Sequence, residues 1–185
     1  MGTQAEQSKT SAQASATVST KQATVSPRRQ FLDALTREHA TTMKVIRAFP
    51  ADKADFKPHE RSSSARQLVW TFVIEQGLML GAITDTLKVG KFPPAPENYD
   101  AIVQQYQDDF NRLRATLETL PDEKLSGTVK FFTGPGQMGD VPKMEVLWFA
   151  LMDQVHHRGQ LSVYVRMAGG KVPSIYGPSA DEPWS

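Results

Sequence analysis

Apolar residues recur at helical spacing in four separate segments of this chain, and this pattern limits the fold more than any other feature. The segments span residues 27–49, 64–90, 98–120 and about 140–167. Apolar residues three or four positions apart lie on one side of a helix, so each segment predicts a helix with a core-facing stripe. Four such helices predict an all-α fold in which the stripes pack together as a four-helix bundle.

Local signals mark where these helices begin and end. Ser26 followed by Pro27 is typical of an N-cap and a first helical residue. Ser64 and Gln67 have the spacing of a capping box. The connection between the third and fourth helices is long enough to cross the end of the bundle, so we expect a long crossover there. Within it, residues 128–133 predict a short strand or an extended crossover segment.

The composition indicates one folded domain that follows a different N-terminal segment. Residues 1–25 consist mostly of Ser, Thr, Ala, Gln and Lys without an aromatic residue, so we expect a disordered low-complexity tail. The bundle domain then covers residues 26–185. Glycines 77 and 81 are four residues apart in the second helix, which predicts close approach of another helix at that face.

Charge and cysteine content exclude several classes of function. The net charge is +1 with mixed signs, which gives no electrostatic case for binding nucleic acid or a membrane. No apolar run is long enough to span a bilayer. The chain has no cysteine, which excludes disulfides, cysteine zinc sites and a cysteine nucleophile. With no recognisable secretory signal, we expect a cytoplasmic protein.

The fourth segment carries titratable residues inside an apolar run. Asp153 and His157 are four residues apart and share a face of the predicted helix, as two ligands of one metal ion do. Burying such groups without partners is costly. His156 points about 100° away from His157 and is expected to act as an indirect or interface residue. Gly159 is expected to permit tight helix packing, and Arg158 to form a structural salt bridge, with Glu75 or Asp153 as candidate partners, or to anchor an anionic substrate.

At these motifs the chain resembles the DinB-like proteins of the DinB/YfiT-like superfamily. The resemblance covers nearly everything from the first helix to the C-terminus and rests on residues 49–50, 56–59, 64–70, 156–161 and 169–177. It implies a four-helix bundle, commonly dimeric, in which three histidines hold a metal. The matching positions here are Thr71, Asp153 and His157, so this chain keeps one of the three histidines.

Three interpretations of this altered site remain open. In the first, Glu75, one turn beyond Thr71, joins Asp153 and His157 to hold a divalent ion such as Zn, Ni, Mn or Fe. In the second, the site is metal-free, and the same side chains form a buried hydrogen-bond network that can include a general base. In the third, the two polar groups of the fourth helix are simply solvated at the end of a groove.

The resemblance also suggests reaction types. It implies a metal-dependent enzyme of the hydrolase type or a transferase dependent on low-molecular-weight thiols, acting on a small-molecule ligand, and a homodimer. The alternative is a non-catalytic small-molecule-binding or stress-response protein that has lost the metal. Tyr176, in the C-terminal segment, is expected either to line a pocket at the bundle mouth or to have a packing role. His39 is expected to be a satisfied core histidine.

Overall fold

The computed structural model describes residues 25–184, and this part of the chain is mostly helical. Its long helices are α1 (Pro27–Ala48), α2 (Ala65–Ile83), α3 (Tyr99–Thr119) and α4 (Lys143–Met167). Two short 3-10 helices, η1 (Ala51–Lys53) and η2 (Asp122–Leu125), and two strands, β1 (Thr128–Gly134) and β2 (Gln137–Pro142), complete it. The predicted bundle of four helices is therefore present, with a small sheet that an all-α fold lacks. The tail predicted over residues 1–25 lies, up to residue 24, outside the described residues.

The predicted helix starts are confirmed by their caps. The Ser26 hydroxyl accepts a hydrogen bond from the Arg29 amide at 3.3 Å, and Pro27 opens α1. At α2 the Ser64 hydroxyl accepts from the Gln67 amide, while the Gln67 side chain accepts from the Ser64 amide. Each bond satisfies a donor that the first turn of a helix leaves free.

Helix α2 ends earlier than predicted, at Ile83 rather than near residue 88. Asp85 has a positive φ of 59°, a left-handed conformation that stops a helix. The apolar pattern continues beyond this point because Leu87 and Val89 pack against a small hydrophobic cluster as part of a loop. Their spacing therefore reflects burial without helical structure.

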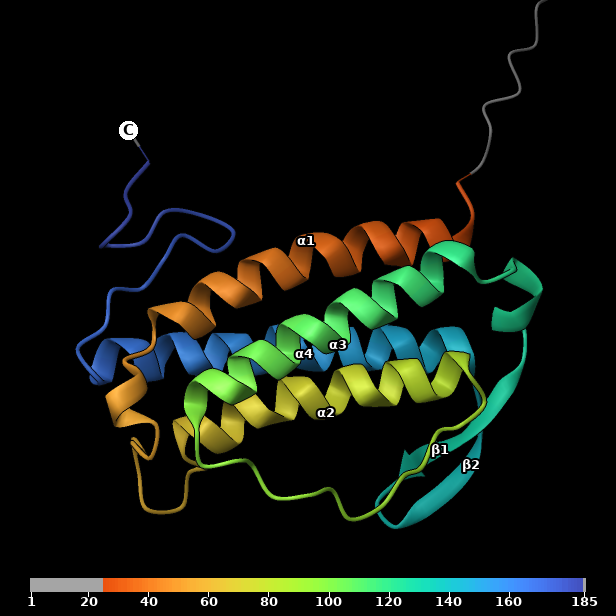
Figure 1. Ribbon diagram of the computed structural model, residues 1–185, viewed down its shortest axis with the longest axis horizontal. Coiled ribbons are helices and arrows are strands. Elements are labelled where there is room, and N and C mark those ends of the chain that lie inside the picture. The colour runs from red at the N-terminus through yellow and green to blue at the C-terminus, as the bar shows by residue number, and fades with distance from the viewer. Residues whose placement is uncertain (1–24, 185) are drawn as a thin grey trace, which may run out of the picture.

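The helices run in pairs of opposite direction (Figure 1). Helices α1 and α4 point one way along the bundle, and α2 and α3 point the other way. The link of residues 84–98 must therefore return along the length of the bundle before α3 can begin. The long crossover predicted between the third and fourth helices is present: it folds into η2 and a hairpin at one end of the bundle and joins two helices that lie diagonally across from each other.

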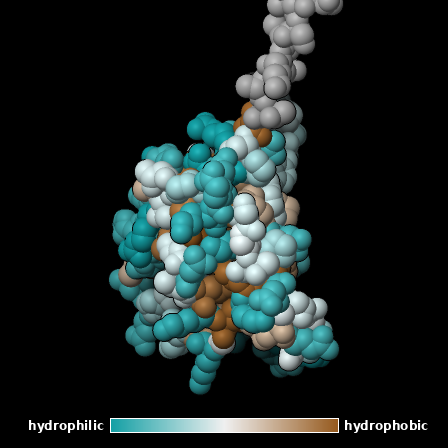
Figure 2. All heavy atoms as spheres, turned by 90° about the vertical axis from the view of Figure 1, so that its right-hand side faces the viewer, coloured by the Kyte–Doolittle hydropathy of each residue, from teal (hydrophilic) through white to brown (hydrophobic). Residues whose placement is uncertain are grey.

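The hairpin forms an antiparallel ribbon of β1 and β2, as the predicted strand allowed. Val129 pairs with Val141 and Phe131 with Gly139. Phe131 is buried and packs with Ala82 and Val146, which fastens the hairpin to the ends of α2 and α4. Figure 2 views this end and shows a hydrophobic patch exposed among polar side chains.

A layer of polar side chains divides the bundle core. One hydrophobic cluster lies at the end where α2 and α3 begin, and a second lies at the end where α1 and α4 begin. Buried polar residues lie between the two clusters on three of the helices. They are His39 and Thr42 of α1, Glu75 and Gln76 of α2, and Gln154 and Arg158 of α4. This layer is where the predicted site residues lie.

None of the helices in residues 25–184 is long and apolar enough to cross a membrane. The cytoplasmic location stays a prediction.

Candidate metal centre

Helices α2 and α4 bring Glu75, Asp153 and His157 together at the polar layer. Each side chain offers one ligand atom, and these atoms lie within 4.8 Å of one another. His157 Nε2 lies 3.6 Å from Asp153 Oδ1 and 3.7 Å from Glu75 Oε1. Asp153 and His157 meet because they are one turn apart on α4. Their role as metal ligands stays a prediction.

Glu75 has the most unfavourable environment of the three. Its side chain is 4% exposed, and neither carboxylate oxygen has a hydrogen-bond partner among the described residues. Burial, followed by the repulsion of the Asp153 carboxylate, raises the pKa of Glu75 to about 10. An unpaired buried carboxyl group is costly, so the structure leaves a place for a positively charged partner here.

The donor set fits a divalent cation. Two carboxylates and one imidazole are ligands that Zn, Ni, Mn and Fe all accept. Atoms bound tetrahedrally at about 2.1 Å from one ion are roughly 3.4 Å apart. The two separations to His157 Nε2, 3.6 and 3.7 Å, are close to that value. We find no conflict between these residues and such an ion.

A hydrogen-bond chain on the surface of α4 orients His157. Its Nδ1 lies 3.1 Å from Gln160 Oε1, and Gln160 Nε2 lies 2.9 Å from His156 Nε2. When Nδ1 carries the proton and donates to Gln160, the lone pair of Nε2 faces the two carboxylates. His156 therefore acts on the cluster through Gln160, which agrees with the indirect role predicted for it.

Thr71, at the third family position, does not join the cluster. Its hydroxyl donates to the Gln67 carbonyl oxygen at 3.2 Å, one turn back along α2. Thr71 instead lines a pocket of about 390 Å³ together with His157, Gln160 and Tyr164. This pocket therefore lies against the His157 side of the cluster.

Arg158 points away from the cluster, so the candidate partners Glu75 and Asp153 were wrong. The structural salt bridge predicted for it is confirmed, because the buried guanidinium donates to Glu38 Oε2 at 2.7 Å and to Thr42 at 3.2 Å. Tyr176 covers Arg158, with 4.9 Å from the guanidinium carbon to the ring centre, and donates to Glu38 at 2.6 Å. These contacts join α1, α4 and the C-terminal segment at the surface, and because Tyr176 itself is 66% exposed, the two roles expected for it stay predictions.

The rest of the polar layer was not predicted from the sequence. Tyr106 of α3 is buried and donates to Gln154 Oε1 at 3.0 Å. Gln76 is buried beside Glu75, and its side-chain amide has no partner among the described residues. Adjacent polar residues in the otherwise apolar second helix were the available signal. His39 is buried as predicted, with its ring stacked on Phe110 at 3.7 Å, but it is not fully satisfied, because its Nδ1 has no hydrogen-bond partner among the described residues.

Comparison with known proteins identifies relatives of this chain. The model of the DinB family matches residues 15–184. The uncharacterized protein YrdA of Bacillus subtilis is 27% identical over 154 residues, which cover 82% of this chain and 89% of that protein.

Two solved structures share the fold. A DinB-like protein of Bacillus cereus superposes with a TM-score of 0.64 at 23% identity, over 79% of this chain and 95% of that one. YfiT of Bacillus subtilis, described as a probable metal-dependent hydrolase with an unusual four-helix bundle topology, gives a TM-score of 0.57 at 14% identity. The match covers 81% of this chain and 93% of YfiT.

Proposed function

The chain belongs to the DinB family, and from this premise we propose that it is a metal-dependent enzyme of the hydrolase type whose divalent ion is held by Glu75, Asp153 and His157. The observation that carries this proposal is the buried Glu75 carboxyl group, which faces Asp153 and His157 and has no hydrogen-bond partner among the described residues. The description of YfiT as a probable metal-dependent hydrolase supports the reaction type. The other type, transfer of low-molecular-weight thiols, stays a prediction.

The residues of the site have separate tasks in this proposal. A divalent ion supplies Lewis acidity and lowers the pKa of bound water. Glu75 and Asp153 balance the charge of the ion, and burial of Glu75 strengthens that attraction by excluding water. Gln160 and His156 fix the tautomer and orientation of His157. The pocket beside Thr71 and Tyr164 receives the small-molecule substrate.

Metal binding by the EDTA-treated protein tests this proposal directly. We expect Zn, Ni, Mn or Fe(II) to raise the unfolding temperature in proportion to the logarithm of ion concentration, because the ion binds only the folded chain. Glu75→Gln and His157→Ala should each weaken binding by at least tenfold. His59→Ala is the matched control, since His59 lies in an exposed loop. If none of the four ions raises the unfolding temperature of the wild-type protein, the proposed metalloenzyme is excluded.

The second candidate is a non-catalytic small-molecule-binding or stress-response protein with a metal-free site. It is favoured by the loss of two of the three histidines that the resemblance implies, at Thr71 and Asp153. In that case elemental analysis of the purified protein finds no stoichiometric metal, and His157→Ala changes ligand binding without abolishing any turnover.

We also propose a homodimer that forms through the exposed face of α4. Four large hydrophobic residues on this face are half exposed, namely Phe149, Met152, Val163 and Met167. Within each pair, Phe149 with Met152 and Val163 with Met167, the residues lie three or four positions apart. The two pairs are about three turns apart, so all four residues share one face of α4, as the contact stripe of a helix does. The exposed His156 and Gln160 lie between the two pairs on this face, and hydrophobic residues gathered on one exposed face indicate an interaction surface.

The stripe is self-complementary, which favours a second copy of this chain as the partner. Phe149 and Met152 precede its middle, and Val163 and Met167 follow it at similar intervals, so two antiparallel copies bring hydrophobic residues opposite each other. Gly159 lies at the middle, and a Cβ there would have no heavy atom within 4 Å. The tight packing predicted for Gly159 is therefore absent within the described chain, and a partner helix can approach at this point.

A further inference from the structure

A second pocket of about 620 Å³ lies on the opposite side of α2 from the candidate metal centre. Helices α2 and α3 form its floor, and the link of residues 84–98 forms one wall. Its volume is in the range of small-molecule sites in proteins, which is about 300–1,000 Å³. Most of the surface is hydrophobic and comes from residues such as Trp70, Val73, Ile74, Leu87 and Phe92.

Hydrogen bonds hold the wall of this pocket in place at both ends. The Trp70 indole donates from Nε1 to the Pro93 carbonyl oxygen at 2.9 Å. At the other end, the Thr86 amide donates to the Gly81 carbonyl oxygen at 2.9 Å. The link is therefore fixed beside α2, and the pocket is part of the folded structure.

Gly77 lies in the pocket surface, and the packing of the bundle does not require a glycine there. A Cβ at Gly77 would have no heavy atom within 4 Å, whereas a Cβ at Gly81 would lie 2.9 Å from the Leu87 Cα. Only Gly81 therefore shows the close approach predicted for this pair, and it comes from the link. Glycine inside a helix costs about 1 kcal/mol relative to alanine. The missing side chain of Gly77 contributes open space to the pocket.

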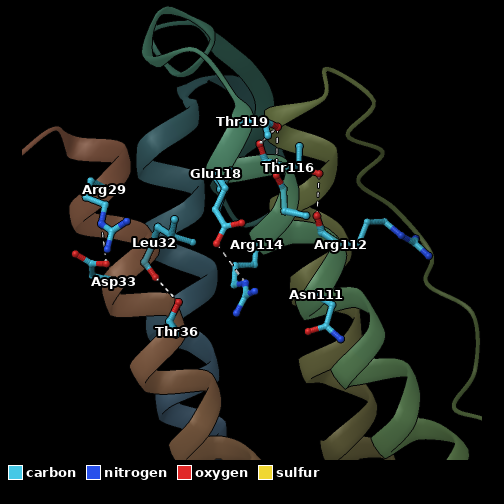
Figure 3. Close-up of polar contacts among 12 residues, drawn as sticks. Arg29, Leu32, Asp33, Thr36, Asn111, Arg112, Arg114, Thr116, Glu118 and Thr119 are labelled. Atoms are coloured by element: carbon cyan, nitrogen blue, oxygen red, sulfur yellow. Dashed lines mark hydrogen bonds and ion pairs between the residues drawn. The ribbon is translucent and has the colours of Figure 1, made fainter.

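The rim of the pocket is positively charged. Lys88 lies on the link with no ion pair or hydrogen bond to a described residue, and Arg112 comes from α3. Arg112 extends away from α1 toward the link, as Figure 3 shows. Its ion pair to Asp109 is long, at 3.6 Å, and the Arg112 side chain is 64% exposed. Asp109 lines the pocket too and accepts a hydrogen bond from Gln105 at 2.9 Å, so two cations and one carboxylate give the lining a net positive charge.

From this combination we propose that the pocket binds an amphipathic monocarboxylate, with its apolar body against Trp70 and Ile74 and its carboxylate beside Arg112 and Lys88. A hydrophobic pocket with a few convergent polar groups is the usual form of a small-molecule site. Guanidinium and ammonium groups in the lining favour a carboxylate over a neutral head group. This site is separate from the metal centre, because it uses the opposite face of α2.

Titration with octanoate tests this assignment in the metal-free, EDTA-treated protein. The probe is the NMR signal of the Trp70 indole N–H, identified by its loss in Trp70→Phe. We expect octanoate to shift this signal saturably, and n-octanol to bind at least fivefold more weakly. Arg112→Gln should reduce octanoate affinity at least fivefold and leave octanol affinity unchanged. His157→Ala should bind octanoate as the wild type does.

Gly77→Leu fills the pocket and should weaken octanoate binding more than tenfold while circular dichroism shows an intact helical fold. If that variant does not fold, Ile74→Trp blocks the same wall. The proposal is overturned if octanoate does not shift the Trp70 signal, or if a folded blocking variant binds as tightly as the wild type. Equal affinity for octanol and octanoate would contradict the proposed binding of a carboxylate. Loss of octanoate binding in His157→Ala would place the ligand at the metal centre instead.

Discussion

At the scale of single residues, Glu75 shows how the candidate site lowers the stability of the metal-free chain. Its carboxyl group is buried next to Asp153, and its pKa of about 10 lies far above the ordinary value of 4.5. Between pH 4.5 and pH 10, Glu75 keeps its proton in the folded chain but has released it in the unfolded chain. The contribution of Glu75 therefore makes the folded state less stable as pH rises from 4.5 to 10.

We predict that Glu75→Gln stabilises the metal-free protein at neutral pH, because glutamine cannot ionise. One unit of pKa corresponds to 1.36 kcal/mol, so the gain in free energy of unfolding should be roughly 3 kcal/mol at pH 7. It should grow by about 1.4 kcal/mol for each further pH unit up to pH 9. Urea unfolding in EDTA at pH 5, 7 and 9 measures it. A gain that does not change with pH would show that Glu75 is not held protonated.

His39 gives the opposite dependence on pH. Burial lowers its pKa from 6.5 to about 4, so the folded chain keeps it neutral while the unfolded chain takes up a proton. Its contribution to stability is present above pH 6.5 and is lost as the pH falls toward 4. The neutral ring that stacks on Phe110 is therefore a source of acid sensitivity.

We predict that His39→Phe flattens the acid limb of the stability curve. The free energy of unfolding of the wild type should fall by about 1.4 kcal/mol per pH unit more than that of the variant between pH 6.5 and 4. Urea unfolding at pH 7, 5.5 and 4.5 gives the comparison. His59→Phe, in the exposed loop, should keep the slope of the wild type, and an identical slope in His39→Phe would contradict the prediction.

At the scale of elements, helix starts were predictable and one helix end was not. Ser26 and the Ser64–Gln67 box are local signals, since each cap satisfies an amide within its own first turn. The end of α2 depends on tertiary burial of Leu87 and Val89, which extends an apolar pattern beyond the helix. Similarly, Glu75, Asp153 and His157 could be placed on helix faces from spacing, whereas Tyr106 and Gln154 become neighbours only across the core of the assembled bundle.

Helix α1 is tied to α4 by the Glu38–Arg158 pair, and this contact should differ sharply from an ion pair on the surface of the same helix. Glu38→Ala leaves the buried Arg158 guanidinium without its carboxylate, which we expect to cost about 3–5 kcal/mol. Asp33→Ala removes the exposed pair with Arg29 seen in Figure 3 and should cost about 0–1 kcal/mol. Chemical denaturation of both variants measures the difference. Equal costs would mean that Arg158 finds another partner or water.

At the scale of the whole molecule, the bundle and the long connection between its third and fourth helices were predictable, but the return of residues 84–98 along the bundle was not. Both links are long enough in sequence to cross the bundle, because extended chain covers about 3.3 Å per residue and helix only 1.5 Å. Length therefore could not show that residues 84–98 run along the bundle while residues 120–142 stay at one end of it. Pairing of Phe131 with Gly139 in the hairpin decides this, and that pairing depends on a turn and on burial against Val146.

If two copies of the chain pair through the exposed stripe of α4, a charge within that stripe should keep them apart. Val163→Asp places a charge where two copies of the stripe meet, so we expect light scattering to show a monomer for this variant and a dimer for the wild type at the same micromolar concentration. Trp184→Asp is the control, because Trp184 is also exposed but lies outside the stripe. Because Val163 is exposed in the single chain, the substitution should leave the thermal unfolding of the monomer nearly unchanged. A wild-type chain that is monomeric at these concentrations, or a Val163→Asp variant that stays dimeric, would exclude this surface as the interface.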